Sequence, residues 1–365
     1  MNTILFFFEY QEISSESIYL HITKSCVCMS CTILVGGNFG DEGKGKIVSH
    51  VAHTDKPQII SRGGVGPNAG HTIVVKDKKF GVRMCPSGFV YQDARLMIGT
   101  GVLIDPTVLL HEIDMLKIDG RISIDKRCSI IEPLHIAEDK SNEYLSKKVG
   151  TTGTGCGPAN RDRAMRTARQ AWEIPELSKY ITDVPFELNT ALDAGKNVLL
   201  EGTQGFGISL YYGEYPFVTS KDTCAAQMAA DNGIGPTRVD DVIVVYKAFP
   251  TRVGSGPFAT EMGPEEARKL GIQEFGTVTG RERRIGYWDP EMARYASMIN
   301  GCTIGAITGI DHVDPDCFGA TRYSQLSQKC KDFLSQAEDD IGAPVLLIST
   351  GPELEQMIDL RTDNS

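Results

Sequence analysis

Short apolar runs rich in β-branched residues alternate with longer amphipathic stretches from about residue 31 to the C-terminus. The short runs predict strands and the stretches with a 3.6-residue period predict helices. The predicted strands cover residues 32–37, 58–61, 71–75, 80–84, 95–98, 197–201, 241–249, 302–308 and 344–349. The predicted helices cover residues 43–53, 105–117, 135–147, 175–194, 289–300 and 324–341. This order indicates an α/β fold, with helices flanking a central, mostly parallel sheet.

The first 30 residues show neither a clear strand pattern nor a clear helix pattern, and Met29 stands three residues before the first predicted strand. We therefore expect residues 1–30 to be an N-terminal extension, either disordered or preceding a natural start at Met29. The remaining residues, 31–365, contain no repeat, no low-complexity segment and no obvious linker. They are predicted to form a single catalytic unit.

Composition excludes several classes of protein. The 47 acidic residues outnumber the 37 basic ones, and a net charge of −10 argues against binding to nucleic acid. The sequence has no apolar run long enough to cross a membrane, and its start lacks the basic region of a secretory signal. The ten scattered cysteines are typical of reduced thiols, which predicts a cytoplasmic protein. Cys26, Cys28 and Cys31 lack the partners that a zinc site requires.

The strongest motif, GGNFGDEGKGK at residues 36–46, joins the first predicted strand to a helix. Such a turn directs backbone N–H groups and a helix N-terminus at a phosphate, and Lys44 stands near the first helical turn. The spacing from Gly37 to Lys44 is one residue longer than in a Walker A motif, and Gly45 replaces its Ser or Thr. Asp41 in such a loop would repel an anion unless it handles a cation or a proton. The motif predicts a nucleotide site similar to that of P-loop NTPases.

Further loops carry polar side chains near predicted strands. The hydroxyl-rich loop 150–158 suits a monophosphate, and the arginines of loop 276–284 suit a carboxylate or phosphate clamp. After the first of these loops, four arginines are predicted to share one helix: Arg161, Arg163, Arg166 and Arg169. Asp311 follows a strand and is able to accept hydrogen bonds from the edge of a guanine base. Each feature also has a plainer interpretation, because a lone histidine such as His71 is usually structural and arginines often form a solvated face.

Taken together and in this order, GDEGKGK, NAGHT, GTTG, EGTQG, YPFVTS, TGRERR and STGP resemble the adenylosuccinate synthetase family in its short archaeal-type form. The resemblance covers residues 31–365. It implies a GTP-hydrolysing ligase of purine and AMP biosynthesis, which joins IMP to L-aspartate through 6-phosphoryl-IMP and releases adenylosuccinate, GDP and phosphate. It also implies a Mg²⁺ requirement and a cytoplasmic homodimer. Gly309 departs from the lysine that is common at this position in longer members.

The resemblance also implies roles for individual residues. The implied catalytic residues are Asp41, Lys44, His71 and Gln204, with Asp41 and the Gly70 carbonyl as magnesium ligands. The implied GTP contacts are Gly40, Glu42, Gly43, Lys44, Gly45, Gly70, Thr72, Asp311, Ser349, Thr350 and Gly351. The implied IMP contacts are Asp41, Asn68, Thr151, Thr152, Gln204, Thr219, Arg281 and, from the neighbouring subunit, Arg166. The implied aspartate contacts are Thr277, Val278, Thr279, Arg281 and Arg283.

Three other functions compete with this interpretation. A viral-type homologue would use (d)GMP and make 2-amino-adenylosuccinate, but such relatives often lack the acid found here at Asp41. A regulatory GTPase would bind GTP alone, and this function does not explain the arginines of loop 276–284, which include Arg281. A dehydrogenase is disfavoured because the glycines do not read G-x-G-x-x-G.

Overall fold

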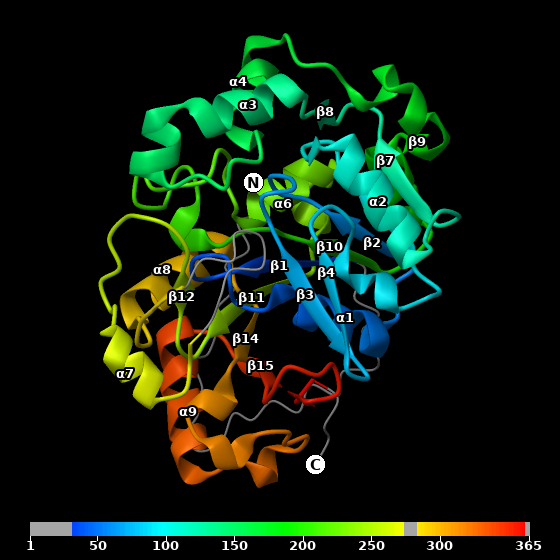
Figure 1. Cartoon of the computed structure of the whole chain (residues 1–365). Helices are drawn as coiled ribbons and strands as arrows, with labels where there is room; N and C mark the ends of the chain where they lie inside the picture. The colour runs from blue at the N-terminus through cyan, green and yellow to red at the C-terminus, as the bar shows by residue number, and fades with distance from the viewer. Residues whose placement is uncertain (1–30, 274–282, 362–365) are drawn as a thin grey trace, which may run out of the picture.

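The computed structural model describes residues 31–273 and 283–361 (Figure 1). Within these ranges, one large sheet has the order β16 (Met357–Asp359), β15 (Val345–Ser349), β14 (Ile304–Thr308), β11 (Asp241–Lys247), β1 (Cys31–Gly36), β10 (Val198–Glu201), β2 (Ile59–Arg62), β5 (Arg95–Ile98), β7 (Ile122–Asp125) and β9 (Ile181–Thr182). All neighbouring pairs are parallel except β15 and β16. The predicted α/β class with a mostly parallel sheet is confirmed.

Three small two-stranded sheets lie outside the main sheet: β3 (His71–Val75) with β4 (Lys78–Val82), β6 (Leu103–Ile104) with β8 (Ser129–Ile130), and β12 (Thr251–Arg252) with β13 (Arg284–Ile285). The helices of the described residues are α1 (Lys44–Asp55), α2 (Pro106–Leu116), α3 (Pro133–Ser141), α4 (Cys156–Met165), α5 (Val184–Asp193), α6 (Ala225–Asn232), α7 (Pro264–Lys269), α8 (Pro290–Asn300) and α9 (Gln328–Ile341). No helix among the described residues has both the length and the apolar composition needed to cross a bilayer.

The side chains of β1 alternate between two hydrophobic cores, one on each face of the sheet. Ile33 and Val35 pack in the core shared with α5, α6, α8 and α9. Leu34 points the other way, into the core shared with α1 and α2. A parallel strand covered on both faces has no polar face, which is why this stretch of sequence is almost wholly apolar. Helices α3 and α4 pack together at one end of the molecule, away from α9 and β15 (Figure 1).

Two predicted helices are shorter than the sequence pattern indicated. The stretch 175–194 is not one helix: a 3₁₀ helix at Pro175–Tyr180 and strand β9 precede α5. Pro185 explains the break, because proline favours the first turn of a new helix, and the Asp183 side chain caps that turn. Similarly, α3 ends at Ser141 and a separate π-helical turn covers Tyr144–Val149.

An ionic cluster fastens β16 to α1. Asp359 contacts His50 of α1 at 3.0 Å, and Arg361 bridges Asp359 to Asp55 at the end of α1. Burial acts to raise the pKa of Asp359, but the hydrogen bonds from His50 and Arg361 outweigh it and hold the pKa well below its ordinary value. The cluster therefore ties the last strand of the sheet to the helix that follows the first.

The substitution Asp359→Asn should lower the free energy of unfolding by about 2 kcal/mol near neutral pH, because Arg361 loses a charged partner. Because the pKa of Asp359 is depressed in the folded protein, this stabilisation is present above the ordinary carboxyl pKa of about 4 and is lost as the pH falls through the folded-state value. Denaturant unfolding of wild type and variant at neutral and at acidic pH measures both effects. The same difference at the two pH values would contradict the ionic role.

Candidate active site

The loop between β1 and α1 is shaped by a buried ion pair. Glu42 accepts hydrogen bonds from the backbone N–H groups of Asn38 and Gly40, at 3.0 and 2.8 Å, and pairs with the Lys44 ammonium at 2.6 Å. Lys44 also donates to the Gly40 carbonyl at 3.0 Å. Gly43 adopts the left-handed conformation, with φ of 79°, immediately before the helix. The predicted strand, turn and helix are confirmed, with Glu42 pointing into the loop.

The first turn of α1 lies directly against β3. A Cβ added at Gly45 would stand 3.0 Å from the His71 Cβ and 3.2 Å from the Ser87 Oγ. The serine or threonine of a Walker A motif would therefore be crowded by the strand that carries His71, which would have to move by a few tenths of an ångström. Glycine at this position allows the first turn of α1, which carries Lys44, to pack closely against β3, which carries His71.

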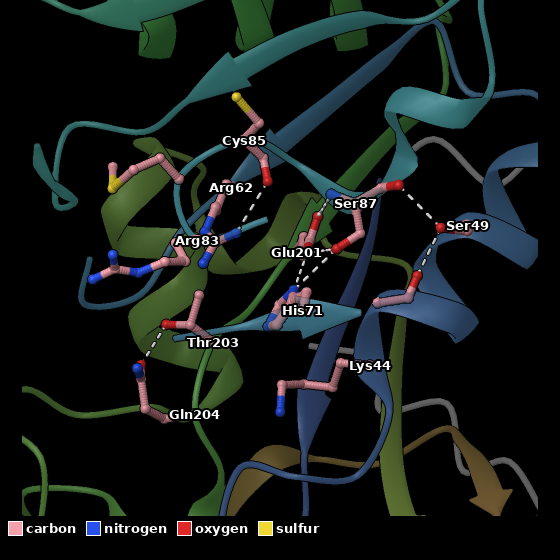
Figure 2. Close-up of polar contacts among 12 residues, drawn as sticks. Lys44, Ser49, Arg62, His71, Arg83, Cys85, Ser87, Glu201, Thr203 and Gln204 are labelled. Carbon is pink, nitrogen blue, oxygen red and sulfur yellow. Dashed lines mark hydrogen bonds and ion pairs between the residues drawn. The ribbon is translucent and has the colours of Figure 1, made fainter. Parts of the chain in front are cut away.

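His71 is oriented by a buried carboxylate (Figure 2). Its Nδ1 contacts the Glu201 Oε1 at 2.5 Å and the Ser87 Oγ at 3.0 Å, and Glu201 also accepts from the Ser87 backbone N–H at 2.6 Å. His71 Nε2 is buried and has no hydrogen-bond partner among the described residues. A ring held by Nδ1 with a free Nε2 is suited to contact a ligand through Nε2.

Burial favours a neutral His71 ring, and the groups around Glu201 favour its ionised form. Burial lowers the pKa of His71, and the hydrogen bond to Glu201 only partly opposes it. Burial acts to raise the pKa of Glu201, but His71 and the nearby Arg62 outweigh it and leave the pKa below its ordinary value. Arg62 is fully buried at the end of β2 and donates to the Cys85 carbonyl at 3.0 Å.

Asp41 lies in the glycine-rich loop 36–46, here called the phosphate loop after its predicted ligand, and it also lines the cavity described below. Its carboxylate pairs with Arg283 at 2.9 Å, so the structure brings together two residues that are 242 positions apart. Burial raises the pKa of Asp41, and the charges of Arg283, Lys247 and Lys44 act in the opposite direction. A carboxylate with a raised pKa is a better proton acceptor near neutral pH than an ordinary aspartate.

A cavity of about 340 Å³ opens beside Asp41, which is within the usual size of small-molecule sites. Its lining includes six of the residues implied as IMP contacts: Asp41, Asn68, Thr151, Thr152, Gln204 and Thr219. Three of them form a chain, in which Gln204 donates to Asn68 at 3.0 Å and Asn68 donates to Thr219 at 3.2 Å. His71 lines the same cavity. The fold therefore brings the six implied IMP contacts, which come from distant parts of the sequence, to one cavity.

Arg166 does not line this cavity. The four arginines 161, 163, 166 and 169 were predicted to share one helix, and this is wrong. Helix α4 ends at Met165, Arg166 caps it in the left-handed conformation with φ of 65°, and Arg169 lies beyond the helix. Arg166 is exposed in the single chain. Thr277, Val278, Thr279 and Arg281 lie outside the described residues.

A second group of implied ligands lies where β14 and β15 end, at the same edge of the sheet as the phosphate loop. Gly309 and Asp311 follow β14, and Ser349–Gly351 follows β15. The phosphate loop is joined to this edge because Thr308 donates to the Glu42 carbonyl at 2.7 Å. Ligands of parallel α/β sheets typically bind at the carboxyl ends of the strands.

Comparisons with known proteins identify the family of this chain. The model of the adenylosuccinate synthetase family matches residues 33–176 and 168–316. The chain belongs to the adenylosuccinate synthetase family. It is 64% identical to the adenylosuccinate synthetase of Archaeoglobus fulgidus over 92% of this chain and 99% of that protein. It is 58% identical to the enzyme of Methanocaldococcus jannaschii over 93% and 99%.

Solved structures show the same fold. The fully ligated adenylosuccinate synthetase of Plasmodium falciparum superposes with a TM-score of 0.84 at 25% identity, over 90% of this chain and 99% of that one. A cyanophage succinoaminodeoxyadenylate synthetase bound to dGMP and dATP superposes with a TM-score of 0.77 at 24% identity, which shows likeness of fold alone. With these relatives, the chain has adenylosuccinate synthetase activity and is a ligase of purine and AMP biosynthesis.

Sequence reasoning missed the positioning residues Glu201 and Ser87. Glu201 was seen only as the first letter of the EGTQG motif, and Ser87 was not singled out. A glutamate that ends an otherwise apolar strand was the available signal, because a buried carboxylate requires partners. The sequence did not indicate which residue Glu201 contacts, because His71 and Glu201 are 130 residues apart.

The substitution Glu201→Gln should reduce adenylosuccinate formation about 100-fold or more, because an amide cannot accept from His71 and both Ser87 donors and so misorients the ring. The measurement is kcat with saturating substrates, alongside a thermal unfolding curve that reports folding. Glu143→Gln, at an exposed glutamate of the same chain, is the control and should retain wild-type activity. A folded Glu201→Gln variant with full kcat would show that Glu201 does not act through His71.

Proposed function

We propose that the chain forms adenylosuccinate, GDP and phosphate from IMP, L-aspartate and GTP through 6-phosphoryl-IMP. The observation that supports this is the shared position of Asp41 and His71. Both line the cavity that holds the implied IMP contacts, and both adjoin the phosphate loop around Lys44. A base next to a phosphoryl-transfer site is what activation of a purine oxygen requires.

Each residue then has a role that follows from its environment. Asp41, with its raised pKa, accepts the N1 proton of IMP, which makes the 6-oxygen nucleophilic. Lys44 and the N-terminus of α1 neutralise charge on the transferred phosphoryl group. His71 faces the same group through Nε2, and a phosphoryl anion there favours the protonated ring with Glu201 as its counter-ion. The amine of aspartate finally displaces phosphate, which is a far better leaving group than hydroxide.

The implied metal fits the residues present. The Asp41 carboxylate already pairs with a cation, the Arg283 guanidinium, and the backbone at Gly70 leads directly into His71 beside it. Carboxylate and carbonyl oxygens are the protein ligands that Mg²⁺ prefers. Asp41 and Gly70 would hold the ion, which supplies neutralisation of phosphate charge.

The proposed assembly is a homodimer that shares Arg166. Support comes from the exposed Arg166 itself and from apolar side chains nearby in the fold that are largely exposed in a single chain, namely Leu134 on α3, Met165 at the end of α4, and Trp172. Such residues are typical of a surface that a second copy covers. The proposed location is the cytoplasm, which is supported by the cysteines of the described residues, all of which are free thiols.

The test is an omission assay that follows adenylosuccinate by its absorbance. The product should form only when IMP, aspartate, GTP and Mg²⁺ are all present. Replacing IMP with dGMP tests the viral-type reaction, and replacing GTP with ATP tests the donor. Product formed from dGMP but not from IMP would overturn the proposal.

The substitution Asp41→Asn should reduce kcat by at least about 100-fold, because an amide does not accept the N1 proton. The exposed Asp93→Asn serves as the control and should keep wild-type activity. Thermal unfolding of both variants reports whether the fold is intact. Asp41→Asn with one tenth of the wild-type rate or more would contradict the proposed base.

Arg166→Leu and Asp41→Ala should each be inactive alone, and a mixture of the two should regain about a quarter of wild-type activity. Half of randomly mixed dimers are hybrids, and each hybrid has one site with both Asp41 and Arg166 intact. The experiment mixes the purified variants after demonstrating subunit exchange with differently tagged chains. Exchange without recovered activity would show that the site is not shared.

A further inference from the structure

Lys46 is a buried lysine that the proposed reaction does not yet use. It lies in the first turn of α1, two residues after Lys44, and only 7% of it is exposed. Its Nζ donates to three oxygens of one loop: the Ser349 Oγ at 2.8 Å, the Gly351 carbonyl at 2.5 Å and the Gln356 carbonyl at 2.8 Å. An ammonium has three donors, so each one is used.

The loop that closes around Lys46, residues 349–356, is the segment implied to contact the guanine base. The Ser349 hydroxyl accepts from Lys46 and donates to the Gly351 carbonyl at 3.1 Å, so its hydrogen points into the loop. The Gln356 side chain accepts from the Glu353 N–H at 2.9 Å, and the Gln356 carbonyl accepts from the Thr350 N–H at 3.0 Å. Without the Lys46 ammonium, three convergent oxygens would lose a common donor, which is costly in a buried place.

The same loop is tied a second time to the phosphate site. The Leu354 N–H donates to the carbonyl of Val74 on β3 at 3.0 Å, and Val74 lies three residues after His71. The base-contacting loop is therefore fixed to both elements that carry phosphate-site residues. Burial lowers the pKa of Lys46 to about 7, and the carboxylates of Asp311, Glu353 and Glu355 oppose this, which places Asp311 within the electrostatic range of Lys46.

We propose that Lys46 is a positioning residue that sets the nucleotide specificity of the reaction. By closing the 349–356 loop against the first turn of α1, it fixes the distance between the base-recognition turn and Lys44. Only a nucleotide whose base fits this turn then places its terminal phosphoryl group beside Lys44. This inference rests on the proposed use of GTP and assigns to Lys46 a role that acts through the loop without contact to the reacting atoms.

The experiment compares kcat/KM for GTP and for ITP, which lacks the exocyclic amine of guanine, in wild type and in Lys46→Met. The ratio of the two values should fall about tenfold in the variant, the size of one lost charge-assisted hydrogen bond. KM for GTP should rise, whereas KM for IMP should stay within about twofold, because the implied IMP contacts lie in the separate cavity. Lys117→Met, at an exposed lysine, is the matched control and should keep the wild-type ratio.

A second variant tests the same loop if Lys46→Met does not fold. Gln356→Ala removes a side chain that holds the loop through the Glu353 N–H and is not an implied GTP contact, and it should lower the GTP to ITP ratio in the same direction by a smaller factor. Equal losses for both nucleotides, or an unchanged ratio in a folded variant, would overturn the role of Lys46. A wild-type enzyme that forms no adenylosuccinate from GTP would instead contradict the proposed function, so the two failures are distinguishable.

Discussion

A carboxylate enclosed by its own loop underlies the geometry of the segment between β1 and α1. Glu42 holds the backbone N–H groups of Asn38 and Gly40 and the ammonium of Lys44 at once, so the seven residues from Asn38 to Lys44 close around a single charge. The glycines near it are required for space: a Cβ at Gly36 or at Gly205 would come within 2.5 Å of the Glu42 carboxylate oxygens. An ion pair this deeply buried is stable only because the remaining oxygen lone pairs also find donors.

The cavity is preorganised by polar groups that satisfy one another. Gln204, Asn68 and Thr219 form a hydrogen-bonded chain along its wall, and Thr203 connects this chain to the backbone of Val65. Gln204 holds a left-handed backbone with φ of 54°, which is strained for a residue other than glycine. Strain of this kind persists only where surrounding contacts determine the backbone. Here the hydrogen bonds of the Gln204 side chain supply them.

The first turn of α1 connects three parts of the candidate site. Its first residue, Lys44, belongs to the phosphate loop, its second, Gly45, allows β3 to approach, and its third, Lys46, closes the loop after β15. One helical turn therefore joins three segments that are far apart in the sequence. Because these segments meet at one turn, a shift of the turn would move Lys44, strand β3 and the 349–356 loop together.

Local pattern in the sequence determined the elements of the sheet, the loops at the strand ends and the family. Apolar runs predicted central strands such as β1, β2 and β10 because these are buried on both faces, whereas β7 and β9, near one edge of the sheet, were not predicted. The glycine-rich motif after β1 predicted the turn into α1 because few other residues allow it. The same pattern misplaced helix ends where a proline or a left-handed cap intervened, as at Pro185 and Arg166.

Tertiary structure alone decided the partners of the charged groups. Glu201 with His71, Arg283 with Asp41, and Lys46 with the 349–356 loop are pairs separated by more than a hundred residues. Periodicity reports only which face of its own element a residue occupies, so it contains no information about which distant group that face meets. The physical reason is that a buried charge is stabilised by the polar groups around it, and these groups come from segments that only folding brings together.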